Sequence, residues 1–543
     1  MTWYVELNDD TYEAAYENFE WDLPDDYNAA YDFLRKHEDL TQTALIQRYP
    51  DGREVTYTFA ELDRLSDRVA AGLADRGIER GDRVAVVVPQ KPANPLTHLA
   101  CWKLGAISLP LSVLFGPDAL EYRLQDSGAS VAVVDTQVYD VVRQVRSACP
   151  SLEHEVEVDG DHDDSEPFES LYEPYDAGRQ IAETTPETDA IITYTSGSTG
   201  PPKGVLNSHG TWIGHCPAFY MYFEREMDGV YWTPADWAWI GALGDLVFPA
   251  WHYGQPVVSY PMGSFDPETA YDILERYDVT STFLPPTAIR MMANVSDPTE
   301  RYELSLEAIC SGGEPLTAEI LDWADEELED VVVNELYGQT EANLLVTNCR
   351  DWFPAKPGSM GKPVPGHDVA IVDDGTGAEL PTGEVGQIGV RRGDDPVIFS
   401  EYWNLPEKTA DVTVGEWHLT GDLGERDSDG YIWFKSRDDD IIITSGYRVG
   451  PGEVESTILE HDAVEQAGVV GVPDDTRGEV IKAFVQPAAG YEGTDEFRNE
   501  IRTHVRENLA KHEYPREIEF MDELPTTTTG KIRRTDLREA ETE

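Results

Sequence analysis

The stretch TYTSGSTGPPKG, residues 193–204, brings hydroxyl side chains, glycines and one lysine together in twelve consecutive positions. Hydroxyl groups and the backbone amides of glycine donate hydrogen bonds, and the ammonium of Lys203 adds a positive charge. Such a segment is suited to bind an anion, for which a polyphosphate is the natural candidate. The same composition is typical of a flexible surface linker, so the residue types alone leave both interpretations open.

The spacing of the glycines excludes one familiar phosphate-binding fold. The P-loop requires G-x-x-x-x-G-K-[ST] at the start of a helix. Here Gly197 is followed by Gly200 and then by Pro-Pro-Lys-Gly, which does not fit. The pair Gly530 and Lys531 does not fit either, because an isoleucine follows it. We therefore expect the anion site to belong to another fold.

The elements around the loop predict an α/β architecture. A capping box at residues 58–61 predicts the start of a helix, whose apolar residues recur at helical spacing until Gly77. Apolar runs typical of buried strands occur at residues 82–88, 130–135, 190–195, 279–287 and 331–341. Because strands alternate with helices, chemistry is expected on loops beyond the strand ends. Both TSGSTGPPKG and the run YGQTE, residues 337–341, lie there, which favours an anion site over a linker.

The charge of the chain is strongly negative. A total of 41 Lys and Arg residues against 104 Asp and Glu residues gives a formal net charge of −63 at pH 7. Such a surface repels nucleic acid and anionic lipid, so we expect neither as a partner. The acidic residues are spread among core-forming apolar segments, which argues against a disordered acidic tail. We interpret the excess as a halophilic adaptation to a cytoplasm of high salt, where screening weakens repulsion between carboxylates.

Cysteine spacing and hydropathy predict a soluble cytoplasmic protein. The five cysteines are far apart and include no C-x-x-C pair, so neither a zinc site nor a disulfide framework is expected. The acidic amino terminus lacks the basic and apolar regions of a secretory signal. The longest apolar stretch, residues 237–251, is too short to span a bilayer and contains Asp245. We therefore expect no membrane insertion.

Length and a change in composition predict two domains. A chain of 543 residues exceeds what one hydrophobic core usually serves. A polar junction begins at Arg437, and the sequence beyond it forms a compact mixed segment. We place a domain boundary there, giving residues 1–436 and 437–543. The ordinary alternative is that the junction is only a solvated charge run.

Five motifs occur in the order and spacing of the adenylate-forming superfamily. They are residues 193–204, 337–341, 417–422, 437–453 and 529–531. This superfamily includes acyl-CoA synthetases, luciferases and the adenylation domains of peptide synthetases. The similarity extends from about residue 30 to residue 540, and the chain resembles the medium-chain acyl-CoA synthetases.

The resemblance implies both a fold and a reaction. The fold would be a large amino-terminal domain of α/β layers with a small β-barrel-like subdomain, followed by a small α+β lid that swings between two half-reactions. In the first, a carboxylic acid and ATP form acyl-AMP and pyrophosphate, with Mg²⁺ bound. In the second, coenzyme A takes the acyl group and AMP is released. The chain would thus be an ATP-dependent acid–thiol ligase of fatty acid metabolism.

The resemblance also implies roles for individual residues. The phosphates of the nucleotide would lie against Thr195, Ser196, Gly197, Ser198, Thr199, Gly200 and Lys203. The rest of the nucleotide would contact Gly313, Glu314, Pro315, Tyr337, Gly338, Gln339, Thr340, Asp422 and Arg437. Catalysis is expected from Thr340, from Glu341 as the Mg²⁺ ligand, and from Lys531 at the α-phosphate. Coenzyme A would pass Ser445, Gly446, Tyr447 and Arg448, and the lid would pivot at Asp439. Taken singly, several of these residues have ordinary readings as turn residues, a core aromatic or a tail lysine.

The acyl pocket implied by the resemblance is formed by Trp239, Ile240, Gly241 and Gly338. Acetate-specific relatives carry a tryptophan directly after the residue matching Tyr337 and a threonine at the position matching Gly241. The two glycines here predict space for several methylenes, and hence a medium-chain, branched or aromatic acid. A short-chain acid such as acetate or propionate is the alternative. On this reasoning Gly338→Trp should shift preference toward short acids.

Other functions share the same motifs. The acyl group could go to a separate carrier protein, and a luciferase-like oxygenase or a non-catalytic nucleotide-binding protein are further alternatives. The presence of Lys531, Glu341, Asp422 and Arg437 favours a working enzyme. Finally, residues 525–531 resemble the segment that protein acetyltransferases recognise in related synthetases, so acetylation and deacetylation of Lys531 are predicted to switch activity.

Overall fold

The computed structural model of the chain describes residues 4–540, with the exception of residues 161, 164, 196–200, 314–315, 317, 329, 438–439, 441, 445–446, 462, 475–477, 489, 510–513 and 527–531. The chain forms two compact units. The first consists of Met1–Ser196, Pro202–Val369 and Val390–His418, and the second of Gly197–Pro201, Ala370–Gly389 and Leu419–Glu543. The domain boundary expected at residue 437 stays a prediction.

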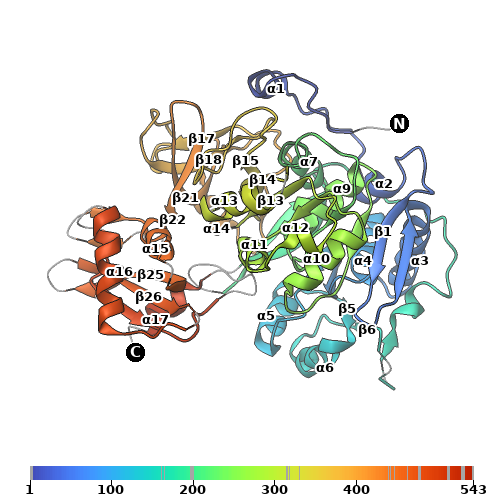
Figure 1. Ribbon diagram of the computed structural model, residues 1–543. Helices are drawn as coiled ribbons and strands as arrows, with labels where there is room; N and C mark the ends of the chain where they lie inside the picture. The colour runs from blue at the N-terminus through green and yellow to red at the C-terminus, as the bar shows by residue number, and fades with distance from the viewer. Residues whose placement is uncertain are drawn as a thin grey trace. The chain divides into compact units, whose positions relative to one another are not determined.

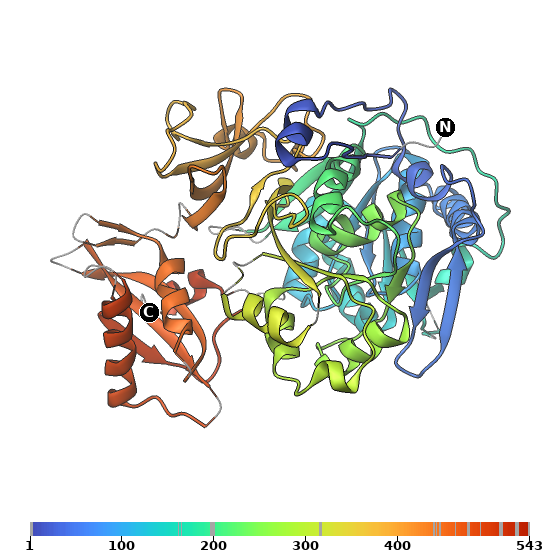
Figure 2. The ribbon, with the colours of Figure 1, turned by 45° about the horizontal axis from the view of Figure 1, so that its top comes forward.

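Two large sheets form the frame of the first unit (Figures 1 and 2). In the described part of the chain, one of them has nine strands. Their order is β16 (Lys362–Pro363), β15 (Ala342–Thr347), β14 (Val332–Gln339), β13 (Ala308–Gly312), β12 (Ser281–Phe283), β10 (Tyr231–Trp232), β11 (Val257–Ser259), β1 (Thr43–Arg48) and β2 (Glu54–Thr58). The strands from β14 to β1 run parallel, and β2, β15 and β16 are antiparallel.

Three amphipathic helices pack against this sheet (Figure 1). They are α10 (Pro267–Arg276), α11 (Pro286–Ala293) and α13 (Ala318–Glu327). Leu274, Ile289 and Ile320, one from each helix, are buried in the same hydrophobic cluster as Trp232 and Ile309 of the sheet. The apolar faces of the helices therefore account for the burial of this side of the sheet.

The second sheet of this unit has eight strands within the described residues. Their order is β19 (Glu401–Tyr402), β9 (Lys203–Ser208), β8 (Asp189–Thr195), β4 (Ile107–Pro110), β3 (Arg83–Val87), β5 (Val131–Asp135), β6 (His154–Val158) and β7 (Glu166–Pro167). Helices α5 (Pro117–Ser127) and α6 (Thr136–Val145) bury Leu124 and Val142 in the cluster that also holds Val134 of β5. The strands and helices alternate as the sequence predicts, and the α/β fold class is confirmed.

A second set of helices packs around large aromatic side chains. These helices are α2 (Ala29–Leu34), α3 (Phe59–Asp75), α4 (Ala93–Leu104), α7 (Thr211–Tyr222) and α9 (Phe248–His252). The rings of Trp102, Trp212 and Phe248 are all fully buried, with centroids 4.9–5.2 Å apart. Helix α3 begins with the predicted capping box, because the side chain of Thr58 and that of Glu61 each accept a backbone hydrogen bond from the other residue.

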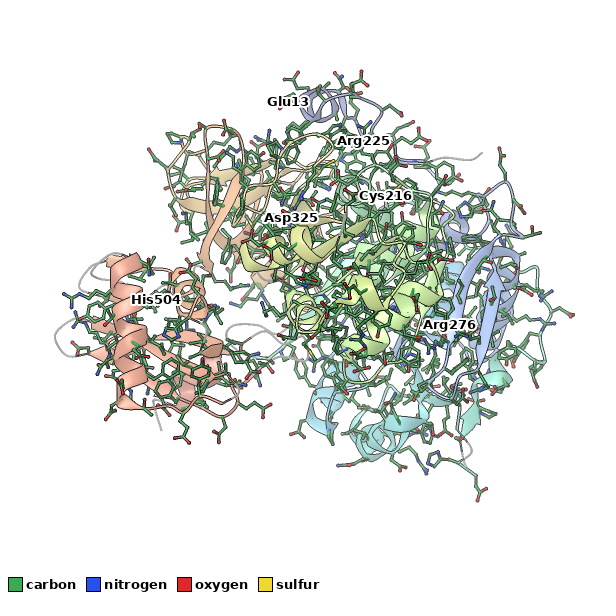
Figure 3. All side chains as sticks on the ribbon, in the orientation of Figure 1. Glu13, Cys216, Arg225, Arg276, Asp325 and His504 are labelled. Carbon is green, nitrogen blue, oxygen red and sulfur yellow. The ribbon has the colours of Figure 1, made fainter. Side chains whose placement is uncertain are left out.

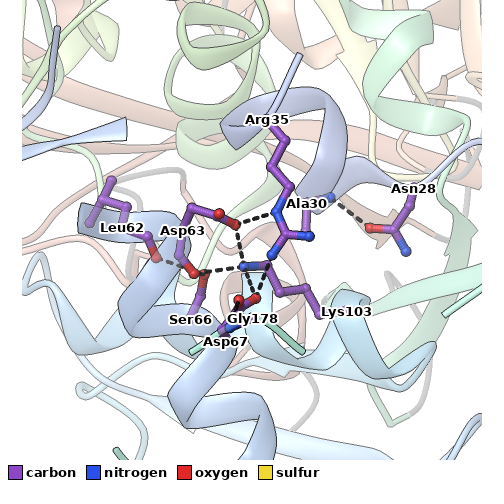
Figure 4. Close-up of polar contacts among 9 residues, drawn as sticks. All are labelled: Asn28, Ala30, Arg35, Leu62, Asp63, Ser66, Asp67, Lys103 and Gly178. Carbon is purple, nitrogen blue, oxygen red and sulfur yellow. Dashed lines mark hydrogen bonds and ion pairs between the residues drawn. The ribbon is translucent and has the colours of Figure 1, made fainter. Parts of the chain in front are cut away.

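A buried ionic network joins three of these helices (Figure 4). The ammonium of Lys103 on α4 lies 2.6 Å from Asp63 and 2.7 Å from Asp67 on α3. Arg35, which follows α2, bonds both carboxylates at 2.7 Å, and the backbone amide of Gly178 donates to Asp67. Burial lowers the pKa of Lys103, although the two carboxylates oppose this effect. The network satisfies each charge and fixes the helices relative to one another.

The remaining helices of the first unit are short, and its cysteines are buried. The helices are α1 (Tyr12–Asn18), α8 (Ile240–Ala242), α12 (Pro298–Arg301) and α14 (Pro406–Asp411). All five cysteines of the chain are free thiols inside the fold, and one of them, Cys216, is labelled in Figure 3. Glu13 and Asp325, also labelled there, are exposed. Among the described residues, no helix has the length and apolar character needed to cross a membrane.

A five-stranded sheet and a separate α+β layer make up the rest of the described fold. The first sheet has the order β17 (Val369–Val372), β18 (Gly386–Arg391), β21 (Trp417–Arg426) and β20 (Thr413–Val414), with β22 (Ile432–Arg437) paired to β21. The other has the order β24 (Tyr447–Val449), β23 (Ile442–Thr444), β26 (Gly478–Pro487) and β25 (Val464–Asp474), with β27 (Glu517–Phe520) paired to β26.

Three helices accompany the carboxy-terminal sheet (Figure 2). They are α15 (Pro451–Leu459), α16 (Asp495–Asn508) and α17 (Arg534–Ala540). Ile458 of α15 and Ile501 of α16 are fully buried in one hydrophobic cluster with Val469 and Ile481 of the sheet. This α+β layer agrees with the small carboxy-terminal fold that the sequence predicts.

Candidate active site

The two described ends of the expected phosphate loop lie on neighbouring strands. Thr195 is the last residue of β8, Lys203 is the first residue of β9, and the two are paired in antiparallel register. The chain therefore leaves and re-enters the sheet at adjacent positions, as a loop that surrounds an anion requires. The five residues between them that carry the expected contacts lie outside the described residues. They are Ser196, Gly197, Ser198, Thr199 and Gly200.

Strand β19 covers the outer edge of β9 and brings an aromatic ring to Lys203. Tyr402 pairs with Val205, and the backbone amide of Trp403 donates to the carbonyl of Gly204 at 2.7 Å. The ammonium of Lys203 lies 4.1 Å from the centroid of the Tyr402 ring. A cation over a tyrosine face is attracted to it, so the ring helps to set the direction of the lysine side chain.

Tyr402 also contacts the predicted metal ligand. Its hydroxyl donates to Oε1 of Glu341 at 2.7 Å, and both residues are buried. The backbone amide of Phe399 donates to the carbonyl of Glu341 at 2.8 Å. The side-chain amide of Asn207 on β9 donates to the carbonyl of Thr340 at 3.3 Å. The structure thus brings Thr195, Lys203, Thr340 and Glu341 of the prediction together in one region of the first unit.

The carboxylate of Glu341 has the chemistry that Mg²⁺ prefers. Oε1 of Glu341 accepts the hydrogen bond from Tyr402. The other carboxylate oxygen, Oε2, accepts no hydrogen bond from the described residues. No group of three or more His, Cys, Asp or Glu side chains suited to a metal occurs in the described part of the chain. Mg²⁺ is often bound by one or two carboxylates together with substrate phosphates, so Glu341 fits this ion.

The hairpin of β14 and β15 contradicts one expectation from the sequence. The strand pairing shifts between Tyr337 and Gln339, which leaves Gly338 in a bulge. A Cβ atom at Gly338 would lie 2.2 Å from the backbone nitrogen of Leu344 and 3.0 Å from a backbone atom of Asn343. The prediction that Gly338 opens space for methylenes is therefore wrong, because backbone occupies that space. The proposed Gly338→Trp exchange would break the hairpin.

The other expected pocket segment contains an open position. Trp239 precedes α8, which continues directly into a π-helical turn, Leu243–Val247. Ile240 is buried. A Cβ atom at Gly241 would lie 3.4 Å from Oδ2 of Asp245 and within 4 Å of no other described atom outside its neighbours and its own helix backbone. Open space therefore lies beside Gly241 and not beside Gly338, and the acyl pocket itself stays a prediction.

Asp245 lies one helical turn beyond Gly241 and is 3% exposed. Its Oδ1 accepts a hydrogen bond from the side-chain amide of Asn343 at 2.6 Å, and its carbonyl accepts one from the hydroxyl of Tyr222 at 2.6 Å. Burial raises the pKa of Asp245 well above its usual range, and the bond from Asn343 opposes this only in part. A buried carboxyl group is thereby linked to the hairpin that carries Glu341.

The segment before Trp239 is anchored by a second buried carboxyl group. Ser112 donates from its hydroxyl to Oδ2 of Asp236 at 2.6 Å, and the backbone amide of Ala238 donates to Oδ1 at 3.0 Å. Burial raises the pKa of Asp236. Both oxygens are occupied, which gives Asp236 a role in shaping this loop.

In the second unit, the structure brings the two predicted ribose ligands together. Asp422 on β21 and Arg437 on β22 are paired residues of adjacent strands. An Nη1–Oδ1 distance of 3.8 Å joins their side chains as a weak ion pair. Gly421 before Asp422 has φ +77°, a conformation that favours glycine. The carboxylate thus lies within strand β21, beside its paired neighbour on β22.

For several predicted site residues, the structure describes only the backbone or nothing at all. Gly313 directly follows β13 and has φ +96°, and Tyr447 and Arg448 lie on β24. The predicted residues that lie outside the described part of the chain are Glu314, Pro315, Asp439, Ser445, Gly446 and Lys531. Their roles remain predictions.

The sequence did not identify two residues that the structure emphasises. Tyr402 stands in the run SEYWN, where no spacing rule distinguishes it from a core aromatic. In the sequence, Asp245 stands out only as a charge within an apolar stretch. That interruption was a usable signal, because a carboxyl group inside an apolar run is buried at a cost and requires a partner.

Comparison with known families and proteins places the chain among nucleotide-dependent ligases. The family model described as AMP-binding enzyme matches residues 34–403, and the one described as AMP-binding enzyme C-terminal domain matches residues 453–531. The mitochondrial acyl-coenzyme A synthetase ACSM4 of Mus musculus is 37% identical over 98% of this chain and 93% of its own length. The acetyl-coenzyme A synthetase of Bacillus subtilis is 36% identical over 97% of this chain and 94% of its own length.

Solved structures resemble the whole chain. The anthranilate CoA ligase AuaEII in complex with anthranoyl-AMP superposes with a TM-score of 0.86 and 28% identity, covering 96% of this chain and 98% of that one. The acyl-CoA synthetase of Brucella canis superposes with a TM-score of 0.75 and 33% identity, covering 98% of this chain and 99% of that one.

Proposed function

The chain belongs to the AMP-binding enzyme family and is an AMP-forming acyl-CoA ligase, and we propose that it activates a medium-chain, branched or aromatic acid. In the first half-reaction a carboxylate attacks the α-phosphorus of ATP and releases pyrophosphate. In the second, the thiol of coenzyme A attacks the acyl carbon and releases AMP. The observation that carries the assignment is the match of family models and full-length relatives to both parts of the chain.

The size of the acid is inferred from Gly241. Space beside this residue allows an acyl chain to approach the helix, and each methylene buried there contributes about 0.8 kcal/mol. Gly338 gives no support for a large acid, because backbone atoms occupy the space beside it. Acetate or propionate is the second candidate, because a relative named acetyl-coenzyme A synthetase is 36% identical to the chain.

Residues of the first unit are proposed to bind the phosphates. Thr195 and Lys203, with residues 196–200, would donate hydrogen bonds and positive charge to them. Glu341 would hold Mg²⁺, which neutralises phosphate charge when bound. Tyr402 keeps the carboxylate of Glu341 oriented through its hydroxyl. Thr340 would contact the nucleotide beside it.

Further residues are proposed to contact the nucleoside. Tyr337, with Gly313, Glu314 and Pro315, would flank the adenine, and Gly338 and Gln339 would complete that surface. Asp422 would accept hydrogen bonds from the ribose hydroxyls, because the two oxygens of a carboxylate suit two donors. Arg437 would add a third contact to the ribose.

The carboxy-terminal part is proposed to act as a lid. Lys531 would stabilise charge at the α-phosphate during adenylation. The passage for the pantetheine arm of coenzyme A would be formed by Ser445, Gly446, Tyr447 and Arg448. Asp439 would be the hinge that absorbs the backbone change between the two states. Acetylation of Lys531 by a protein acetyltransferase would remove its charge, and a deacetylase would restore it; mass spectrometry of Lys531 before and after deacetylase treatment tests this.

The acidic composition is proposed as a halophilic adaptation of a cytoplasmic enzyme. Screening by salt reduces the repulsion that a net charge of −63 produces. Activity and unfolding midpoint should both rise between low and molar KCl. Full stability without salt would contradict this proposal.

The test of the proposed function is a series of carboxylic acids. We expect pyrophosphate release with ATP and each acid from acetate to decanoate and with benzoate, and kcat/KM should be largest beyond acetate. Thioester should form only when coenzyme A is present. A maximum at acetate would favour the short-chain candidate. Pyrophosphate release without any thioester would favour transfer to a separate carrier protein.

A further inference from the structure

Asp245 is a buried carboxyl group that the fold alone does not explain. It belongs to the π-helical turn between α8 and α9, inside an apolar stretch. Such turns frequently occur at functional sites. Residues four apart lie on the same face of a helix, so Asp245 shares the face of Gly241.

The two oxygens of this carboxyl group have different surroundings. Oδ1 accepts the hydrogen bond from Asn343. In the described structure Oδ2 accepts no hydrogen bond, and it is the atom that a Cβ at Gly241 would meet at 3.4 Å. Oδ2 therefore faces the open position of the expected acyl pocket.

A purely structural role would leave half of the group unused. Fastening the hairpin through Asn343 requires only Oδ1, and an asparagine at position 245 would do this without placing an ionisable group in the interior. A carboxyl oxygen that borders open space can accept a hydrogen bond from a group that enters this space. Oδ2 lies beside open space and accepts no hydrogen bond from the described residues, which points to a donor that arrives with the substrate.

We propose that Asp245 is a specificity-determining residue whose Oδ2 accepts a hydrogen bond from a hydroxyl or amino group on the acyl part of the substrate. The inference rests on the proposed function and narrows it to carboxylic acids that bear such a donor. A hydroxyl group fits either protonation state of the carboxyl group, since it both donates and accepts. An ammonium group would instead pair with the ionised form.

Matched pairs of acids test the proposal in the wild-type enzyme. The probes are benzoate against 2-aminobenzoate, 3-hydroxybenzoate and 4-hydroxybenzoate, and hexanoate against 6-hydroxyhexanoate and 6-aminohexanoate. We expect kcat/KM for pyrophosphate release to be at least about tenfold higher for one donor-bearing acid than for its unsubstituted partner, since an unmade hydrogen bond discriminates strongly. The hydroxyl-bearing acids test a hydroxyl donor, and the amino-bearing acids test an amino donor. Equal values within every pair would overturn the proposal.

Two variants test the residue. Asp245→Asn keeps the shape of the side chain. Its amide oxygen can still accept the hydrogen bond from Asn343, so its amide nitrogen, a donor, would lie where Oδ2 lies now. We expect the ratio of kcat/KM between the donor-bearing acid and its unsubstituted partner to fall about tenfold. Gly241→Ala, which should cover Oδ2 without altering the carboxyl group, should reduce the same ratio and decides the matter if Asp245→Asn does not fold.

Glu335→Gln is the matched control. Glu335 is also a buried carboxyl group in the first unit, and burial raises its pKa to about 8. This variant should change both members of a pair equally. If Asp245→Asn does the same, the role of Asp245 is structural and the proposal is wrong. If no acid yields AMP and thioester, the proposed function itself fails. This result is distinct from failure of the Asp245 proposal, in which acids are activated but kcat/KM is equal within every pair.

Discussion

Tyr402 contacts both the predicted phosphate-binding lysine and the predicted metal ligand. Its ring lies against the ammonium of Lys203, and its hydroxyl donates to Glu341. We expect Tyr402→Phe to keep the ring and lose the hydrogen bond. Because such a bond contributes about 1 kcal/mol net, or more to a charged group, pyrophosphate release should fall about tenfold. The Mg²⁺ concentration for half-maximal rate should rise as well.

A second, partly buried tyrosine provides the control for this experiment. Tyr194 donates from its hydroxyl to Asp126 at 2.6 Å in the same sheet, so Tyr194→Phe removes an equivalent bond. Its effect should be confined to stability. An unchanged Mg²⁺ dependence in Tyr402→Phe would show that the hydroxyl does not orient Glu341.

Lys531 and Gly446 are predicted to act in different half-reactions. Lys531→Ala should reduce acyl-AMP formation on the order of 10²–10³-fold, as removal of one positioned donor does elsewhere. It should still convert supplied acyl-AMP and coenzyme A to thioester. Gly446→Leu should do the reverse, because a side chain would obstruct the passage of the pantetheine arm. Loss of the same half-reaction in both variants would contradict the swinging-lid assignment.

At the scale of elements, the hairpin of β14 and β15 depends on the absence of a side chain. A Cβ at Gly338 would lie 2.2 Å from backbone, which cannot rotate away. We expect Gly338→Ala to lower the free energy of unfolding by about 1–3 kcal/mol. Denaturant unfolding measures this. Gly241→Ala is the control and should have a smaller effect, since its nearest described neighbour outside the local helix is a side-chain oxygen at 3.4 Å.

The sequence predicts regular elements better than it predicts their irregular junctions. The apolar runs become β3, β5, β8, β12 and β14, and the capping box starts α3, because period and caps are local signals. Gly338 was misjudged because a bulge depends on the register of a second strand. Tyr402 was missed because its partners, Lys203 and Glu341, are distant in the chain.

At the scale of the whole molecule, buried histidines make stability depend on pH. Burial lowers the pKa of four of them to about 3 and that of His252 to about 4, against an ordinary value of 6.5. The four are His98, His209, His215 and His418. Between pH 6.5 and the lowered pKa values, the unfolded chain therefore binds more protons than the folded chain. The free energy of unfolding should fall as pH decreases from about 6.5.

Denaturant unfolding at constant ionic strength between pH 8 and pH 5.5 measures this dependence. Carboxylates that are paired in the folded state act in the same direction, so a variant must isolate the histidine contribution. His98 has no hydrogen-bond partner for either ring nitrogen among the described residues, and His98→Phe should flatten the slope. An unchanged slope in this variant would mean that His98 is not buried in its neutral form.

Strand β19 has a consequence for how the chain is made. The edge of β9 that it covers is synthesised long before Tyr402 emerges from the ribosome, because residues 206–401 intervene. During that interval the hydrogen-bonding groups of β9 are an open template for pairing with other chains. A nascent chain that ends at residue 396 should therefore aggregate or remain bound to chaperones, whereas one that ends at residue 418 should be released in soluble form. Translational pausing within this window would lengthen the vulnerable period.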